Sequence, residues 1–149
     1  MSWPDAYDPP IPPAHDEFCL IPLTLAHNEA DLDAWASSVG HIHATPGFET
    51  RPWPDEPMTV ARNAADLQEH MDDFAAGLGF TYSVLDRPGG EVIGCVYIYP
   101  SDEEGVDADV RSWVRAGRAE LDEPLYRTVA AWLEAEWPFH AVAYAPRGS

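Results

Sequence analysis

Three consecutive stretches in the second half of the chain alternate apolar and polar residues, and this pattern constrains the fold more than any other feature. They are residues 80–86 (FTYSVLD), 91–100 (EVIGCVYIYP) and 109–115 (DVRSWVR), and a period of two is typical of β-strands. The RPGG between the first two predicts a hairpin turn. A helical pattern at 123–137 and an apolar stretch at 140–147 follow. Because a helix between two strands of one sheet implies a parallel crossover, we expect a mixed sheet.

The first half of the chain predicts one more strand and two helices. The apolar run at 18–25 favours a strand, and Pro22 restricts it to an edge or a bulge. Asn28 is a suitable N-cap for a first helix that ends at Gly40, and Asn63 is a suitable N-cap for a second. The sequence therefore predicts an α/β (α+β) fold with a mixed, mostly antiparallel sheet of about five strands and three helices.

The length of 149 residues is typical of one domain. Residues 1–16 are acidic and rich in proline, which predicts a flexible arm, and residues 17–149 are expected to form the domain. No apolar run approaches the roughly 20 residues that span a bilayer. The N-terminus also lacks the basic and apolar regions of a signal peptide. We therefore expect a cytoplasmic protein that does not enter a membrane.

The chain is strongly acidic. Lys and Arg together number 8 against 26 Asp and Glu, which gives a formal net charge of -18 at pH 7. Such a field repels the phosphate backbone of nucleic acids, so nucleic-acid binding is not expected. It attracts a small cationic amine or a basic protein partner. A second interpretation stays open, because net charge also simply keeps proteins soluble.

The histidines do not form a metal-binding pattern. His41 and His43 are spaced i, i+2, but zinc takes about four ligands, and neither His70 nor His140 is placed near them by the sequence. No metal site is therefore predicted. Two alternatives remain for the aromatic loop residues, which either line a pocket or pack as ordinary loop residues: Trp35, His41, His43 and Trp53.

The hairpin and the strand after it resemble a known family, the GNAT (Gcn5-related) N-acetyltransferases. FTYSVLDRPGGEVIGCVYIYP resembles their central hairpin, and DADVRSWVR resembles the next strand, whose splayed end holds the pantetheine of acyl-CoA. From residue 18 onward the chain also resembles short actinobacterial GNAT-like proteins with segments such as WPDEPMT. The resemblance implies a truncated acyl-CoA N-acyltransferase fold, because family members continue with a further helix and strands. It also implies an open sheet edge at 140–144, which either the N-terminal arm covers or a second subunit covers in a homodimer.

The resemblance also implies a binding site for acetyl-CoA. In the family, the loop after this strand reads [RQ]-x-x-G-x-[GA], and its amides hold the pyrophosphate. The implied cofactor-binding residues here are Trp113, Val114, Arg115, Arg118, Ala119 and Glu120. The two small positions are replaced by Leu121 and Glu123, and Pro124 lacks an amide proton. The acidic residues would also repel phosphate, so the loop is degenerate.

Candidate catalytic residues lie on the hairpin. The resemblance implies that a glutamate or a water chain near the central strands deprotonates the amine, and Glu91 is the glutamate of this hairpin. Tyr97 and Tyr99 share one face of the strand, where they either line the acceptor pocket or only pack across the sheet. Two functions follow. The chain transfers an acetyl group from acetyl-CoA to an amine, or it is a catalytically inactive GNAT-like binding or dimerisation module that has lost acetyl-CoA binding. The sequence leaves both open.

Overall fold

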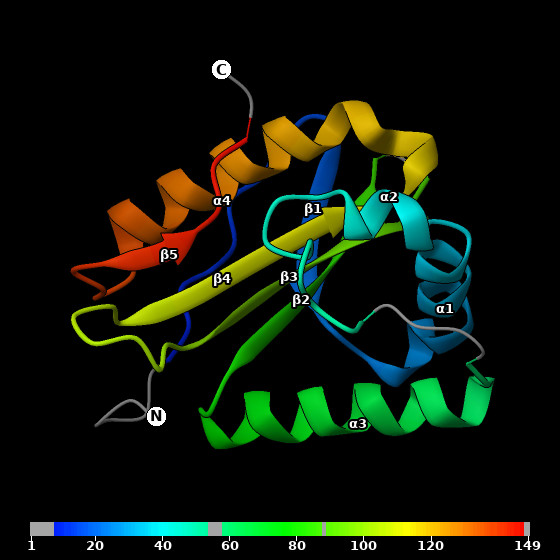
Figure 1. Cartoon of the computed structure of the whole chain (residues 1–149), viewed down its shortest axis with the longest axis horizontal. Coiled ribbons are helices and arrows are strands. Elements are labelled where there is room, and N and C mark those ends of the chain that lie inside the picture. The colour runs from blue at the N-terminus through cyan, green and yellow to red at the C-terminus, as the bar shows by residue number, and fades with distance from the viewer. Residues whose placement is uncertain (1–7, 54–57, 88, 148–149) are drawn as a thin grey trace.

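The computed structural model describes residues 8–53, 58–87 and 89–147, and it shows one five-stranded sheet with helices around it (Figure 1). The strand order is β1-β2-β3-β4-β5. The strands are β1 Phe18–Pro22, β2 Phe80–Asp86, β3 Val92–Pro100, β4 Ala108–Val114 and β5 Val142–Tyr144. The first four strands pair antiparallel and β5 joins β4 in parallel. The predicted mixed, mostly antiparallel sheet is confirmed, with β1 at one edge as Pro22 required.

In the described part of the chain four α-helices accompany the sheet, where three were predicted. They are α1 Asn28–Ala36, α2 Val39–His43, α3 Val60–Ala76 and α4 Asp122–Glu136, and 3-10 turns precede α1 and α4. Gly40 was expected to end the first helix but lies inside α2. The first helix ends at Ser37 instead, because the Ser37 hydroxyl donates to the carbonyl of Asp33 at 2.8 Å. No helix in the described ranges is long and apolar enough to cross a bilayer.

Neither asparagine caps a helix as predicted. Thr59 is the N-cap of α3, and its hydroxyl accepts from the amide of Arg62 at 3.0 Å. Asn63 lies one turn inside that helix and is buried. Asn28 is the first residue of α1, and its side chain donates to the carbonyl of Val60 at 2.9 Å. Both side chains connect α1 to α3 through hydrogen bonds and do not cap the start of a helix.

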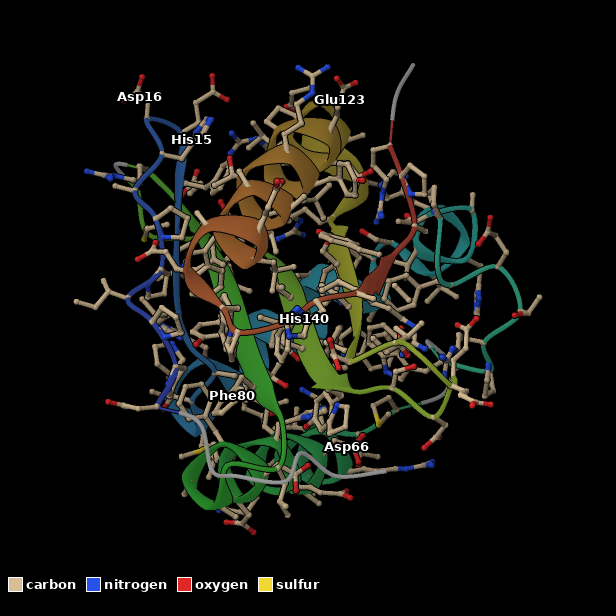
Figure 2. The ribbon with its side chains drawn as sticks, turned by 90° about the vertical axis from the view of Figure 1, so that its left-hand side faces the viewer. His15, Asp16, Asp66, Phe80, Glu123 and His140 are labelled. Atoms are coloured by element: carbon tan, nitrogen blue, oxygen red, sulfur yellow. The ribbon has the colours of Figure 1, made fainter. Side chains whose placement is uncertain are left out.

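The two faces of the sheet are covered differently. One face packs against the buried stripe of α4, formed by Leu125, Val129, Trp132 and Leu133. The other face packs against α1, α2 and α3 through a second apolar cluster that includes Trp35, Ile42, Leu67 and Trp113. This second face also contains most of the buried polar groups of the helices. Figure 2 shows Glu123, at the start of α4, and Asp66, on α3, at opposite ends of the molecule.

Candidate functional site

A cavity of about 390 Å³ lies on the face covered by α1 and α3, between those helices, the loop after α2 and strands β3 and β4. Aromatic rings form part of its wall, contributed by Phe48, Trp53, Tyr97 and Tyr99. Carboxylates form another part, contributed by Asp31, Asp66, Glu69 and Asp73. A cavity of this size accommodates a small organic molecule.

The aromatic wall is centred on Trp53. Its ring centroid lies 5.5 Å from that of Trp35, 5.9 Å from those of Phe48 and Trp113, and 6.3 Å from that of Tyr97. The indole N–H of Trp113 donates to the hydroxyl of Tyr97 at 3.0 Å, which fixes both rings. Because the faces of aromatic rings are electron-rich, a wall of this kind favours a cation.

Asp31 is a buried carboxylate in the wall of the cavity, and it is only 6% exposed. It accepts a hydrogen bond from Asn63 Nδ2 at 3.1 Å, and the indole N–H of Trp35 donates to Asn63 Oδ1 at 3.1 Å. Among the described residues, no ion pair joins Asp31 to an arginine. Burial raises the pKa of Asp31 to about 6, and the bond from Asn63 opposes that rise. A buried carboxylate without a counter-charge suits a cationic ligand.

His70 has the arrangement of a general base. Its Nδ1 lies 2.8 Å from the hydroxyl of Tyr99, which donates to Asp73 Oδ2 at 2.9 Å. A carboxylate only accepts hydrogen bonds, so the Tyr99 hydroxyl donates its one proton to Asp73. The hydroxyl oxygen therefore accepts from His70, which donates from Nδ1. Its Nε2 is then the unprotonated nitrogen. Burial lowers the pKa of His70 although Asp73, Glu69 and Asp66 oppose the shift, so the ring is neutral at pH 7.

Gly79 determines the position of the Tyr99 ring. A Cβ atom at residue 79 would lie 2.1 Å from Tyr99 Cε2, which is far inside van der Waals contact. We expect Gly79→Ala to destabilise the fold by about 1–3 kcal/mol, because Tyr99 must move away from His70 and Asp73. Urea unfolding measures the change. Gly117→Ala is the matched control, since a Cβ there meets nothing within 4 Å. Equal stability of the two variants would contradict the role of Gly79.

The structure brings together only some of the residues predicted from the sequence. Tyr97 and Tyr99 both line the cavity. Glu91 lies elsewhere, 63% exposed, with its carboxylate 3.0 Å from Arg115. Within the described ranges, no group of three His, Cys, Asp or Glu side chains could hold a metal ion.

Sequence reasoning missed the roles of Asp31, Asn63 and His70. One signal was present, because Asp31 lies four residues before Trp35 and Asn63 four residues before Leu67. Each of the two therefore occupies the buried face of its helix. A polar side chain on the buried face of a helix requires a hydrogen-bond partner, so both positions indicate a buried polar contact.

The loop after β4 was predicted to hold the pyrophosphate of acetyl-CoA. It forms the 3-10 turn Ala116–Leu121, which leads into α4. The amide of Ala116 donates to Ser38 Oγ at 2.9 Å, and the amide of Arg118 donates to the carbonyl of Arg115 at 2.9 Å. Both amides therefore form hydrogen bonds within the protein and are not free to bind an anion.

The side chains of this loop also oppose an anion. Leu121 is buried in the core, and Asp122 and Glu123 place carboxylates in the first turn of α4. The arginines are already paired, Arg115 with Asp33 and Glu91, and Arg118 with Asp86 and Glu120.

The gap between β4 and β5 is filled by the chain itself. The two strands pair only as far as Val110 and Tyr144. Beyond that point the Arg147 side chain, 2% exposed, donates from Nη2 to the carbonyl of Ser112 at 2.7 Å and from Nε to Asp122 Oδ2 at 2.9 Å. The residues present therefore do not fit an acyl-CoA here, and we assign it no step. Cofactor contacts at Trp113, Val114, Arg115, Arg118, Ala119 and Glu120 stay a prediction.

No protein-family model and no curated protein matches the chain. Solved acetyltransferase structures do. Ribosomal-protein-S5-alanine acetyltransferase from Vibrio fischeri matches with a TM-score of 0.67 and 12% identity over 91% of this chain and 73% of its own. The ribosomal L7/L12 alpha-N-protein acetyltransferase RimL, in complex with coenzyme A, matches with a TM-score of 0.64 and 12% identity over 84% and 66%.

A third match is the microcin C7 self immunity acetyltransferase MccE, in complex with acetyl-CoA and AMP. Its TM-score is 0.58 and its identity 13%, over 82% of this chain and 66% of its own. The chain thus spans about two thirds to three quarters of the length of these proteins. At such low identity the similarity concerns the fold, and the chain has the fold of the GNAT acetyltransferases.

Proposed function

We propose that this protein binds a cationic amine in the cavity lined by Asp31 and the aromatic wall. The observation that carries the proposal is the buried carboxylate of Asp31, which faces the cavity with no arginine paired to it in the described part of the chain. An ammonium group would supply the missing positive charge, and the faces of Trp53 and Tyr97 would stabilise it further.

The other charges in the cavity support the same ligand class. Asp66, Glu69 and Asp73 lie on one side of α3, at spacings of three and four residues, and all line the cavity. The net charge of -18 adds a long-range field that draws cations toward the protein. Both features raise the local concentration of an amine and disfavour an anionic ligand at this side of the cavity.

Transfer of an acyl group to the bound amine is the second candidate function. The neutral ring of His70 favours it, because an unprotonated Nε2 could take a proton from the ammonium group and leave a nucleophilic amine. The structural neighbours are acetyltransferases, which supports a role in acetyl transfer. The acyl donor would be a thioester, so that the new C–N bond forms as the C–S bond breaks and the thiol leaves with a proton. No particular thioester is assigned, since the loop after β4 does not fit the pyrophosphate of acyl-CoA.

The identity of the amine is a separate question. RimL is named for the ribosomal protein L7/L12, so an α-amine of a protein is one member of the proposed ligand class. A free small amine is another. Binding of a basic protein and formation of a homodimer through the β5 edge stay predictions.

A matched pair of probes tests the proposal. We expect 2-phenylethylamine to bind at least about 10-fold more tightly than 2-phenylethanol, which has nearly the same size and ring but no charge. Isothermal titration calorimetry at pH 7.5 measures both. Equal affinities would contradict cation recognition. Acyl transfer is tested separately by mass spectrometry of the amine after incubation with acetyl-CoA, with His70→Gln as the control.

A further inference from the structure

Two arginines at one end of the cavity share a single carboxylate. Arg111 Nη2 donates to Asp109 Oδ2, and Arg51 Nη2 lies 3.7 Å from the same oxygen. Among the described residues, Asp109 is the one carboxylate within 4 Å of either guanidinium. Each guanidinium has five N–H donors in a planar fork, so a single shared oxygen leaves most of them without a protein acceptor of this kind.

Two other arginines have more carboxylate partners. Arg115 has two carboxylates within 3.2 Å, from Asp33 and Glu91, and Arg118 has two, from Asp86 and Glu120. Asp102 and Glu103 also act on Asp109, but both are exposed and lie in the loop between β3 and β4. Glu49 lines the same groove, and its carboxylate accepts from the amide of Gly47 at 2.8 Å. What the two arginines offer an anion is therefore unused N–H donors rather than an excess of positive charge.

The two arginines lie where two hollows meet. Both line the cavity of about 390 Å³, and both also line an open groove of about 560 Å³ along β4 and β5. Arg111 stands opposite Tyr97 in the pairing of β4 with β3, so it adjoins the aromatic wall. The carboxylates of Asp31 and α3 belong to the cavity alone. The cavity therefore has an acidic side and, at its other end, two guanidinium groups.

We propose that the ligand carries an anionic group in addition to its amine, and that Arg51 and Arg111 bind that group. This inference rests on the proposed function, because the amine has to occupy the acidic side. Guanidinium groups bind carboxylates and phosphates through paired N–H donors, so the chemical class is an amine that bears a carboxylate or a phosphate. The aromatic wall of the cavity accommodates an apolar or aromatic group between the two charged ends of such a ligand.

Four probes with one skeleton test the inference by calorimetry at pH 7.5. They are 2-phenylethylamine, L-phenylalanine, 4-(2-aminoethyl)benzoate and 4-(2-aminoethyl)phenyl phosphate, and the last three add a carboxylate at two positions or a phosphate. We expect at least one anionic probe to bind about 10-fold or more tightly than the parent amine. The order of affinities among the three anionic probes shows whether the site prefers a carboxylate or a phosphate, and at which position on the ligand the anionic group lies.

Two variants assign the preference to the arginines. Arg51→Gln and Arg111→Gln are expected to remove the preference for the anionic probe without weakening the binding of 2-phenylethylamine, because each removes a positive charge from the cavity wall. Arg62→Gln is the control, because it makes the same charge change at an exposed position on α3 outside the cavity. Circular dichroism and a thermal melt of each variant verify that it is folded.

The outcomes separate this inference from the proposed function. If 2-phenylethylamine binds and no anionic probe binds more tightly, the inference is wrong and the amine site stands. A preference that survives in both arginine variants also overturns it. If none of the four probes binds, the proposed function and the inference fail together.

Discussion

Asp31→Asn is expected to weaken the binding of a cationic amine strongly and at the same time to stabilise the fold. The substitution removes the charge that faces the cavity, but it keeps a side-chain oxygen that can accept from Asn63 Nδ2. Loss of a buried charged partner costs about 2–5 kcal/mol in binding, so the affinity for 2-phenylethylamine should fall by about 30-fold or more. Calorimetry measures it, and an unchanged affinity would remove Asp31 from the site.

The gain in stability follows from the pKa of Asp31. A pKa that burial raises from 3.8 to about 6 means that the folded protein disfavours the charged carboxylate by roughly 3 kcal/mol at neutral pH. Asparagine carries no charge and avoids this cost. Urea unfolding at pH 7.5 should therefore show a higher free energy of unfolding for Asp31→Asn. Asp72→Asn is the matched control, because it makes the same charge change on the exposed face of α3.

The raised pKa of Asp31 also determines how the difference in unfolding free energy between the two proteins changes with pH. Because the pKa of Asp31 is higher in the folded state, its contribution to stability is fully present below pH 3.8 and is lost as pH rises through about 6. The advantage of Asp31→Asn should thus be small near pH 4 and complete above about pH 7. His70 shares the cavity, and to first order its titration cancels in the difference between the two proteins. A difference that does not vary with pH would contradict the burial of a charged Asp31.

The parts of the fold that were predictable from the sequence depend on local rules. The RPGG turn and the period of two define the β2–β3 hairpin without any knowledge of the rest of the chain. The parallel pairing of β5 with β4 follows from the strand–helix–strand connection, because the helix returns the chain to the side of the sheet from which β4 started. Each of these needs only the order of residues along the chain.

The two wrong N-cap predictions have one physical cause in common. Asn28 and Asn63 are good N-caps in isolation, but their side chains hydrogen-bond each other across α1 and α3, with Asn63 Nδ2 2.8 Å from Asn28 Oδ1. A single sequence gives no sign of which of two competing partners a side chain meets. The candidate site has the same property, because Asp31, His70 and Tyr97 come from three elements that only the folded chain brings together. Tyr97 was identified because it lies on the predicted hairpin.

Arg147→Ala is the second substitution with a large expected effect. The Arg147 guanidinium is buried, and it donates to Asp122 Oδ2 and to the carbonyls of Ser112 and Ala145. It also lies 5.8 Å and 5.7 Å from the ring centroids of Tyr126 and Tyr144. Its removal leaves these acceptors without a donor, and we expect a loss of about 3–5 kcal/mol in the free energy of unfolding.

Two further variants make that result specific. Arg127→Ala is the matched control, since Arg127 pairs with Glu123 on the exposed surface of α4, where such a pair contributes about 0.3–0.5 kcal/mol. The double variant Arg147→Ala with Asp122→Ala should recover part of the stability, because it also removes the carboxylate left without a cation. If Arg147→Ala is no less stable than Arg127→Ala, then Arg147 does not hold the gap between β4 and β5.

Two features oppose the binding of coenzyme A: the Arg147 side chain in the gap between β4 and β5, and the loop after β4. Titration of coenzyme A into the wild-type protein and into Arg147→Ala distinguishes between them. If the Arg147 side chain alone fills the gap, Arg147→Ala should bind coenzyme A and the wild-type protein should not. We expect neither to bind at millimolar concentration, because the amides of Ala116 and Arg118 stay engaged and the carboxylates of Asp122 and Glu123 stay at the start of α4. Binding by the wild-type protein would show that the loop rearranges around a phosphate, and acyl transfer to the amine would then become the leading function.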